Sequence, residues 1–169
     1  MGEAPKTRIV QPSTPEQLDA FRGLMREWFD FLVNDHGLDM GYQSVDAELA
    51  GLPGAYAPPK GRMWLACDAP GEAVGCVALR PMTDEGVCEL KRLYVRPAHR
   101  GQGIGRALAV QAISEARAMG YRLMRLDNGT FLEASRRLYA SLGFVETGPY
   151  YEVPPDVLRV TIFMELPLR

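Results

Sequence analysis

The sequence predicts one domain, spanning residues 1–169, of the α/β (α+β) class. Its 169 residues are 47% hydrophobic, which is enough for a single domain with its own core. Runs rich in β-forming residues follow one another in the middle of the chain, and helical stretches separate others. A strand at 87–96, a helix near 103–119 and a strand at 122–127 predict a right-handed crossover between two parallel strands.

A short strand and a long amphipathic helix are predicted first. Residues 6–10 form the strand. Ser13 or Thr14 then caps a helix that has Pro15 in its first turn. Apolar residues recur at helical spacing after this cap, and Gly37 closes the segment.

A second short helix and a hairpin follow. Residues 44–50 form the helix, with Ser44 as its cap. The Gly- and Pro-rich stretch 51–61 is predicted to be a loop. Residues 62–68 and 73–80 are predicted strands, because Asp-Ala-Pro-Gly provides a turn between two β-forming runs.

The strand after this hairpin carries charges among apolar side chains. Under strict alternation Glu89 and Lys91 share one face. Leu93 and Val95 lie on that same face, and Arg92 lies on the other. Such charges indicate the edge of a cleft, or else an edge strand whose charges block aggregation.

The C-terminal part alternates helices with strands. The helix near 103–119 has one apolar stripe and ends at Gly120. A second helix runs through the apolar positions between Phe131 and Leu142 and ends at Gly143. The last two predicted strands are 144–146 and 160–166.

Alternate glycines between the strand 87–96 and the next helix predict an anion site. Gly101, Gly103 and Gly105 are flanked by Arg100 and Arg106. The glycines allow close approach of the backbone, and the helix N-terminus offers unpaired N–H groups to a phosphate. The spacing G-x-G-x-G fits neither the dinucleotide fingerprint nor the P-loop.

Two segments resemble the GNAT superfamily of N-acetyltransferases. One is Arg-Gly-Gln-Gly-Ile-Gly from Arg100, with Leu-Tyr-Val just upstream, and the other is Leu-Tyr-Ala-Ser-Leu-Gly-Phe from Leu138. The resemblance covers residues 60–147 well and the flanks weakly. It implies a mixed, largely antiparallel sheet of six to seven strands, splayed at the cofactor site and flanked by about four helices. It also implies acetyl-CoA as co-substrate and no metal.

The resemblance further implies which residues hold the coenzyme. The backbone of Leu93, Tyr94 and Val95 would bind the pantetheine as another strand, with the amide of Leu93 or Tyr94 polarising the thioester carbonyl. The residues expected to hold the pyrophosphate are Arg100, Gly101, Gln102, Gly103, Ile104, Gly105 and Arg106. One departure is Leu132, which stands where many relatives carry an Asn that touches the cofactor; Asn128 lies four residues earlier.

Acyl transfer to an amine needs a base for the ammonium proton and an acid for the thiolate. By resemblance Glu89 is the candidate base, and the competing interpretation is a solvated or substrate-orienting carboxylate. Tyr139 is the candidate acid, and the competing interpretation is a packed aromatic ring. Lys91 either pairs with Glu89 or attracts the cofactor. Tyr150 and its neighbour Tyr151 belong either to an acceptor-side loop or to a loop anchored by its rings.

The remaining candidates favour no metal chemistry. The three cysteines are odd in number, far apart and without a C-x-x-C pair, so we interpret them as small buried residues in a reducing, cytoplasmic protein. Of the two histidines, His99 is a surface loop residue or a phosphate contact. His36 is a helix C-terminal residue favoured by the dipole.

Composition and charge limit the partners. The formal net charge of −2 does not favour nucleic acid, and no apolar run is long enough to span a bilayer. The acceptor is expected to be a primary amine of a small molecule or peptide. Apolar residues Val160, Ile162 and Phe163 in the last strand predict a homodimer contact. The alternative function is a non-catalytic acyl-CoA sensor on the same fold.

Overall fold

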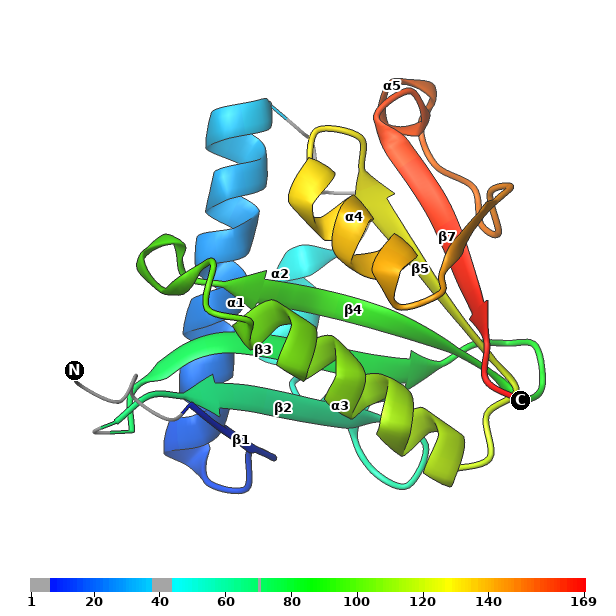
Figure 1. Cartoon of the computed structure of the whole chain (residues 1–169). Coiled ribbons are helices and arrows are strands. Elements are labelled where there is room, and N and C mark those ends of the chain that lie inside the picture. Colours follow the sequence, from blue (N-terminus) through cyan, green and yellow to red (C-terminus); the bar gives the residue numbers. More distant parts are fainter. Residues whose placement is uncertain (1–6, 38–43, 70) are drawn as a thin grey trace.

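Seven strands in the order β1-β2-β3-β4-β5-β7-β6 form one sheet in the computed structural model (Figure 1). The structure describes residues 7–37, 44–69 and 71–169. Neighbouring strands are antiparallel except for β4 and β5, which are parallel. The predicted mixed, largely antiparallel α/β fold is therefore confirmed.

The strands and helices follow the predicted order closely. The strands are β1 (Arg8–Val10), β2 (Arg62–Cys67), β3 (Ala73–Pro81), β4 (Val87–Val95), β5 (Leu123–Gly129), β6 (Val145–Thr147) and β7 (Thr161–Pro167). The α-helices are α1 (Pro15–His36), α2 (Val45–Ala50), α3 (Ile104–Ala118), α4 (Glu133–Ser141) and α5 (Pro155–Leu158). The single turn α5 lies in a stretch for which the sequence analysis predicted no helix. Lys6, the first residue of the predicted first strand, lies outside the described residues. None of the described helices has the length and apolar character needed to cross a bilayer.

The N-terminus of α1 is capped as predicted, but that of α2 is not. The Thr14 side chain accepts a hydrogen bond from the Gln17 N–H at 3.2 Å, and the Gln17 side chain accepts one from the Thr14 N–H at 3.3 Å. Gly37 closes α1 in the left-handed conformation, with φ 63°. Ser44 makes no capping bond, because its own φ of 52° departs from the extended conformation of a capping residue.

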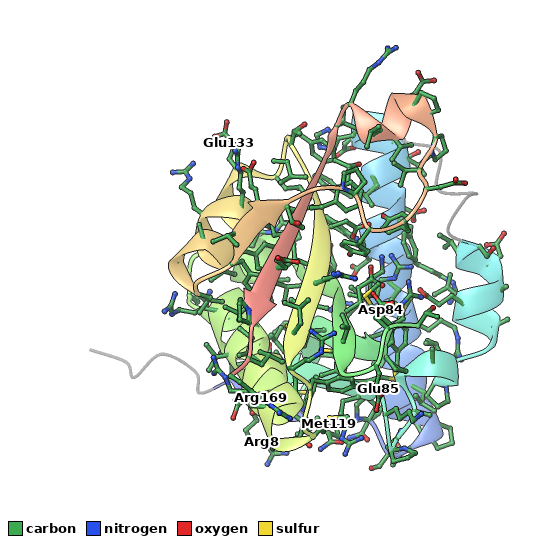
Figure 2. All side chains as sticks on the ribbon, turned by 90° about the vertical axis from the view of Figure 1, so that its right-hand side faces the viewer. Arg8, Asp84, Glu85, Met119, Glu133 and Arg169 are labelled. Carbon is green, nitrogen blue, oxygen red and sulfur yellow. The ribbon has the colours of Figure 1, made fainter. Side chains whose placement is uncertain are left out.

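Two helical layers enclose the sheet, and each covers its own core. Helices α3 and α4 lie on one side and α1 and α2 on the other (Figure 2). We call these sides the α3 face and the α1 face. Buried strand residues of the α3 face include Val77, Leu79, Leu90, Met124 and Leu126. Those of the α1 face include Met63, Leu65, Cys76, Ala78 and Tyr94.

The sheet opens between β4 and β5. These strands pair only from Val87 to Glu89 on β4 and from Leu123 to Arg125 on β5. Beyond that point they diverge, as Figure 1 shows, and α4 lies over the open end. The predicted splay is therefore confirmed, and both its walls come from the predicted strand–helix–strand unit.

A β-bulge corrects the predicted faces of β4. Arg92 has φ 61°, and the register shifts there, so that Arg92 and Leu93 together oppose Val77. Lys91 opposes Ala78 on the α1 face, and Glu89, two residues earlier, shares that face. Leu93 packs on the opposite, α3 face. The prediction that Glu89 and Lys91 share a face with Leu93 and Val95 was wrong, because the bulge inserts one residue into the alternation.

The interpretation of β4 as an edge strand is also wrong. It lies between β3 and β5 in the centre of the sheet. The last strand, β7, is likewise paired on both sides, by β5 and β6, and Phe163 is buried. The predicted homodimer therefore loses the exposed sheet edge on which it was based, and it stays a prediction.

Burial protonates the two core thiols and makes stability sensitive to high pH. Burial raises the pKa of Cys88 to about 12 and also raises the pKa of Cys76. The unfolded chain releases these protons from about pH 8.5, whereas the folded chain keeps them. Their contribution is therefore fully present below about pH 8.5 and is lost as pH rises from there toward the folded-state pKa.

We predict that Cys88→Ala makes the alkaline loss of stability shallower. Urea denaturation between about pH 9 and 10.5 should show a slope reduced by up to about 1.4 kcal/mol per pH unit. Cys67→Ala is the control, because Cys67 is only partly buried and should change the slope less. An unchanged slope for Cys88→Ala would contradict the argument.

Candidate active site

The predicted anion loop leaves its backbone open to a ligand. The turn Pro97–His99 is followed by Gly101 and Gly103, whose φ angles are 77° and 80°. Gly103 is the N-cap of α3. A Cβ atom added to either glycine would have no neighbouring atom within 4 Å. Among the described residues no hydrogen bond is found from the N–H groups of residues 104–106, so the first donors of α3 are available to an anion.

A cavity of about 570 Å³ lies over this loop. It runs from the loop along β4 to the start of α4. The predicted coenzyme residues that line it are Leu93, Tyr94, Val95, Arg100, Gly101, Gly103, Ile104, Gly105 and Arg106. Gln102 is the one predicted residue of this set that does not line the cavity. The structure thus brings the predicted coenzyme site together in one place.

Both flanking arginines are held at this cavity. The Arg100 Nε donates to the Val95 carbonyl at 2.9 Å, and its guanidinium lies 5.8 Å from the centre of the Tyr94 ring. The Arg106 Nη1 donates to the Ser141 hydroxyl at 2.9 Å. Two cations are therefore positioned beside the open N-terminus of α3.

Strand alternation decides which amides of β4 face the open gap. The Arg96 N–H donates to the Val74 carbonyl of β3 at 2.9 Å, so the Tyr94 amide also points toward β3. The amides of Leu93 and Val95 then point away from β3, into the gap left by β5. Of the two amides expected to polarise the thioester, the geometry favours that of Leu93.

A smaller cavity, of about 90 Å³, lies inside the splay itself. Tyr139 and Asn128 line it from the α3 face, and Lys91 and Asp127 line it from the α1 face. In the part of the chain that the structure describes, the Tyr139 hydroxyl has no hydrogen-bond partner. Burial raises the pKa of Tyr139, so the hydroxyl keeps a proton to donate.

Asn128 lies beside Leu132, the residue that stands where many relatives carry an Asn. Both residues line the small cavity, and the Asn128 Nδ2 donates to the Leu132 carbonyl at 3.4 Å. An amide side chain is therefore present in the splay, although it comes from the end of β5 rather than from the helix.

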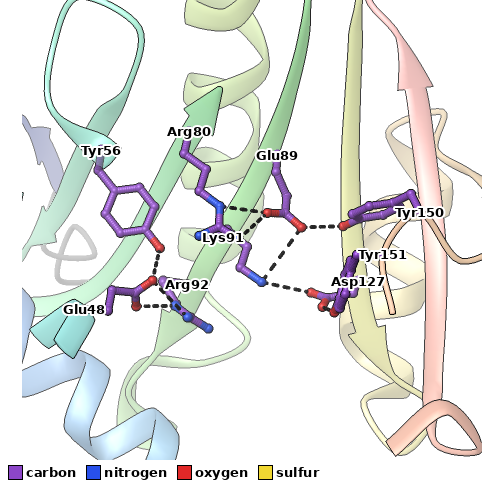
Figure 3. A network of polar contacts seen from close by, with 9 residues as sticks. All are labelled: Glu48, Tyr56, Arg80, Glu89, Lys91, Arg92, Asp127, Tyr150 and Tyr151. Carbon is purple, nitrogen blue, oxygen red and sulfur yellow. Dashed lines mark hydrogen bonds and ion pairs between the residues drawn. The ribbon is translucent and has the colours of Figure 1, made fainter. Parts of the chain in front are cut away.

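Glu89 lies in a buried network of charges on the α1 face (Figure 3). Its Oε1 accepts from the Arg80 Nε at 2.9 Å, and its Oε2 accepts from the Tyr150 hydroxyl at 2.6 Å. The Lys91 Nζ lies 3.9 Å from Glu89 and 3.5 Å from Asp127, so it bridges β4 and β5 across the splay. Glu89 is only 2% exposed, so the interpretation of a solvated carboxylate is wrong.

Asp127 is a functional candidate that the sequence analysis missed. Burial acts to raise its pKa, but Lys91, the Tyr151 hydroxyl and Arg92 outweigh burial and hold the pKa below its ordinary value. A carboxylate next to Asn128, near the end of the predicted strand, was the available signal. The sequence alone could not reveal this candidate, because the charge that keeps Asp127 ionised comes from Lys91 on the neighbouring strand β4.

A second charged pair fixes the strained bulge. The Arg92 Nε donates to Glu48 of α2 at 2.8 Å, and the Tyr56 hydroxyl donates to the same carboxylate at 2.6 Å. The Arg92 guanidinium also lies 4.8 Å from the centre of the Phe29 ring. These contacts tie α1, α2 and the turn at Tyr56 to the central strand.

A third cavity, of about 320 Å³, opens on the α1 face. The residues that line it are Ser44, Arg80, Met82, Glu89, Lys91, Arg92, Tyr150, Tyr151 and Glu152. The rings of Tyr150 and Tyr151 also pack on Phe163, at 5.2 and 5.4 Å between ring centres. The rings therefore anchor the loop as one interpretation held, and the loop also lines a cavity; its acceptor-side role stays a prediction.

The histidines and cysteines take structural places. The His99 Nε2 lies 3.6 Å from Asp68, and the residue lines the large cavity near the anion loop. His36 is in the last turn of α1, as predicted, and stacks on Phe131 at 3.8 Å between ring centres. The Cys76 Sγ contacts the Arg92 carbonyl in the core, where burial opposes thiolate formation.

Known proteins are similar to this chain in sequence and in fold. The model of the acetyltransferase (GNAT) family matches residues 19–144. An uncharacterized N-acetyltransferase of Schizosaccharomyces pombe is 42% identical over 151 residues, which cover 89% of this chain and 90% of that protein. The uncharacterized N-acetyltransferase YjgM of Escherichia coli is 32% identical over 145 residues, which cover 83% and 84%.

Solved structures agree on the fold. A GNAT-family acetyltransferase from Staphylococcus aureus has a TM-score of 0.77 at 17% identity, covering 97% of this chain and all (100%) of that one. The protein yncA of Salmonella typhimurium, solved with acetyl-CoA, has a TM-score of 0.65 at 23% identity, covering 97% and 95%. The chain therefore belongs to the GNAT family of acetyltransferases, and it is an acyltransferase.

We predict that Gly103→Ala weakens acetyl-CoA binding by roughly tenfold or more, because a Cβ enters the space through which a phosphate reaches the α3 amides. Gly120→Ala is the matched control, since Gly120 also has a positive φ, 91°, and no neighbour within 4 Å. Both variants should lose about 1–2 kcal/mol of stability. Calorimetric titration and the ligand-induced rise in Tm measure the difference. Equal affinities for the two variants would contradict this site.

Proposed function

We propose that this protein transfers the acetyl group of acetyl-CoA directly to a primary amine. The observation that carries the proposal is the small cavity in the splay, where Tyr139 and the open edge of β4 meet Lys91 and Asp127. It shares Leu93 with the coenzyme cavity, and it shares Lys91 and Arg92 with the cavity on the α1 face. Donor and acceptor can therefore approach from opposite faces of the sheet.

The donor side is supported by backbone geometry. The pantetheine arm would pair with the outward amides of Leu93 and Val95 in place of the missing strand. The pyrophosphate would bind the first N–H groups of α3 together with Arg100 and Arg106. The Leu93 N–H would then donate to the thioester oxygen as charge develops on it.

We assign the role of base to Glu89 and the role of acid to Tyr139. Glu89 accepts a proton from the substrate ammonium, directly or through a water, and the free amine attacks the thioester carbon. The new C–N bond forms, the C–S bond breaks, and Tyr139 gives its proton to the departing thiolate. The attacking nitrogen then loses its second proton to solvent, and a solvent proton restores the Tyr139 hydroxyl. Glu89 and Tyr139 lie on opposite faces of the sheet, so each can serve its own side of the reacting carbon.

A non-catalytic acyl-CoA sensor is the competing function. Release of free thiol from acetyl-CoA in the presence of an amine panel separates the two, because a sensor would bind acetyl-CoA and release none. Cytoplasmic location and a homodimer stay predictions of the sequence.

We predict that Tyr139→Phe lowers kcat and kcat/KM together by roughly 10²–10⁴-fold, the range for loss of a general acid. The acetyl-CoA affinity and the fold should be retained, because only a hydroxyl without a partner in the described residues is removed. Since burial raises the pKa of Tyr139, wild-type kcat should not decline from this group below about pH 10.

The control is Tyr121→Phe, which removes a hydroxyl that donates to the Lys60 carbonyl away from these cavities. This variant should keep wild-type kcat. If Tyr139→Phe also keeps wild-type kcat with an acceptor for which chemistry limits the rate, Tyr139 is a packed aromatic ring and not the acid.

A further inference from the structure

The cavity on the α1 face has the dimensions of a small-molecule site. Its volume of about 320 Å³ lies at the lower end of the range for small ligands. Its floor is β4, and one wall is the loop that carries Tyr150 and Tyr151. Tyr150 holds Glu89 from this wall, so an acceptor that reaches the proposed base must occupy this cavity.

Three cationic and two acidic side chains line this cavity. Arg80, Lys91 and Arg92 line it, against Glu89 and Glu152. Glu152 is exposed at the rim, whereas Lys91 and Arg92 are 5% and 8% exposed. Lys91 and Arg92 are already ion-paired with Asp127 and Glu48, so their charges are largely balanced. Arg80 is therefore the lining cation whose contacts matter most for an acceptor in this cavity.

Arg80 keeps hydrogen-bonding capacity for a ligand. Its Nε and Nη2 both contact Glu89 Oε1, at 2.9 and 2.8 Å. No hydrogen bond to its Nη1 is found in the part of the chain that the structure describes, and the side chain is 36% exposed. A guanidinium anchored on the base can thus offer another N–H to an anion located next to the reacting amine.

We propose that the acceptor is a small molecule with a carboxylate adjacent to its primary amine, as in a free amino acid. The carboxylate binds Arg80, and the ammonium lies toward Glu89. This inference rests on the proposed function, and it narrows the acceptor class. It disfavours a peptide N-terminus, whose neighbouring carboxyl group is an uncharged amide, and it disfavours polyamines.

The test compares L-α-amino acids with their amides, which keep the amine and side chain and lose the anion. Calorimetric titration into protein saturated with coenzyme A measures binding without turnover. Thiol release from acetyl-CoA measures reaction. For wild-type protein we expect at least one amino acid to bind about 10- to 100-fold more tightly than its amide, the scale of a charged hydrogen-bonded pair. The ratio of kcat/KM should favour the acid similarly.

Three variants assign the preference to Arg80. Arg80→Gln should bring the acid and the amide to within about threefold of each other, mainly through KM for the acid. Arg80→Lys should restore part of the preference, because it returns the charge without the fork of donors. Arg62→Gln is the matched control, since Arg62 lies on the adjacent strand and contacts Glu115 on α3. It should leave the ratio unchanged, and all three variants should keep the acetyl-CoA affinity.

The outcomes separate this inference from the proposed function. Preferential binding of acids without thiol release would support the inference and count against the acetyltransferase function. Thiol release with acids and amides alike, or with amides preferred, would overturn the inference and leave that function standing. An unchanged preference in Arg80→Gln, or no binding of any acid to the wild type, would also overturn it.

Discussion

The separation of β4 and β5 after Glu89 and Arg125 is the constraint on which the rest of the structure depends. A parallel pair that continued would satisfy the backbone groups of Leu93 and Val95 and would close the sheet. Because β5 turns away, those groups become available to a ligand, and the gap is spanned by side chains instead. Lys91, 3.5 Å from Asp127 and 3.9 Å from Glu89, is the bridge that remains where backbone pairing stops.

This arrangement places charges where they weaken the fold. Glu89, Lys91 and Arg92 are 2%, 5% and 8% exposed, and desolvating such groups is repaid only by well-placed partners. Apolar residues of similar volume would fill the same positions at less cost. The charges instead surround the cavity on the α1 face and form the floor of the splay. Residues that bind or catalyse commonly lower the stability of the fold in this way.

The sequence predicted what is local and missed what needs two segments at once. The cap at Thr14, the stop at Gly37 and the glycine loop at 101–105 each follow from residues within a few positions, and the structure has all three. The placement of Leu93 was wrong because one residue, Arg92, adopts a left-handed conformation held by Glu48, and these two lie far apart in the chain. Asp127 was missed for the same reason, since its partners are Lys91 on β4 and Tyr151 on a later loop.

The bulge at Arg92 divides β4 into two halves whose odd-numbered residues face opposite sides of the sheet. Before it, Glu89 and Lys91 face the α1 side, the proposed entry of the acceptor. After it, Leu93 and Val95 present their backbone to the proposed coenzyme site. The half after the bulge offers main-chain groups, and it pairs with β3 independently of the side chains before the bulge. With the acceptor bound as we propose, substitutions around Arg80 or Tyr150 would change which molecule is acylated without rebuilding the donor site. One inserted residue would then make the choice of acceptor separately adjustable in evolution and in engineering.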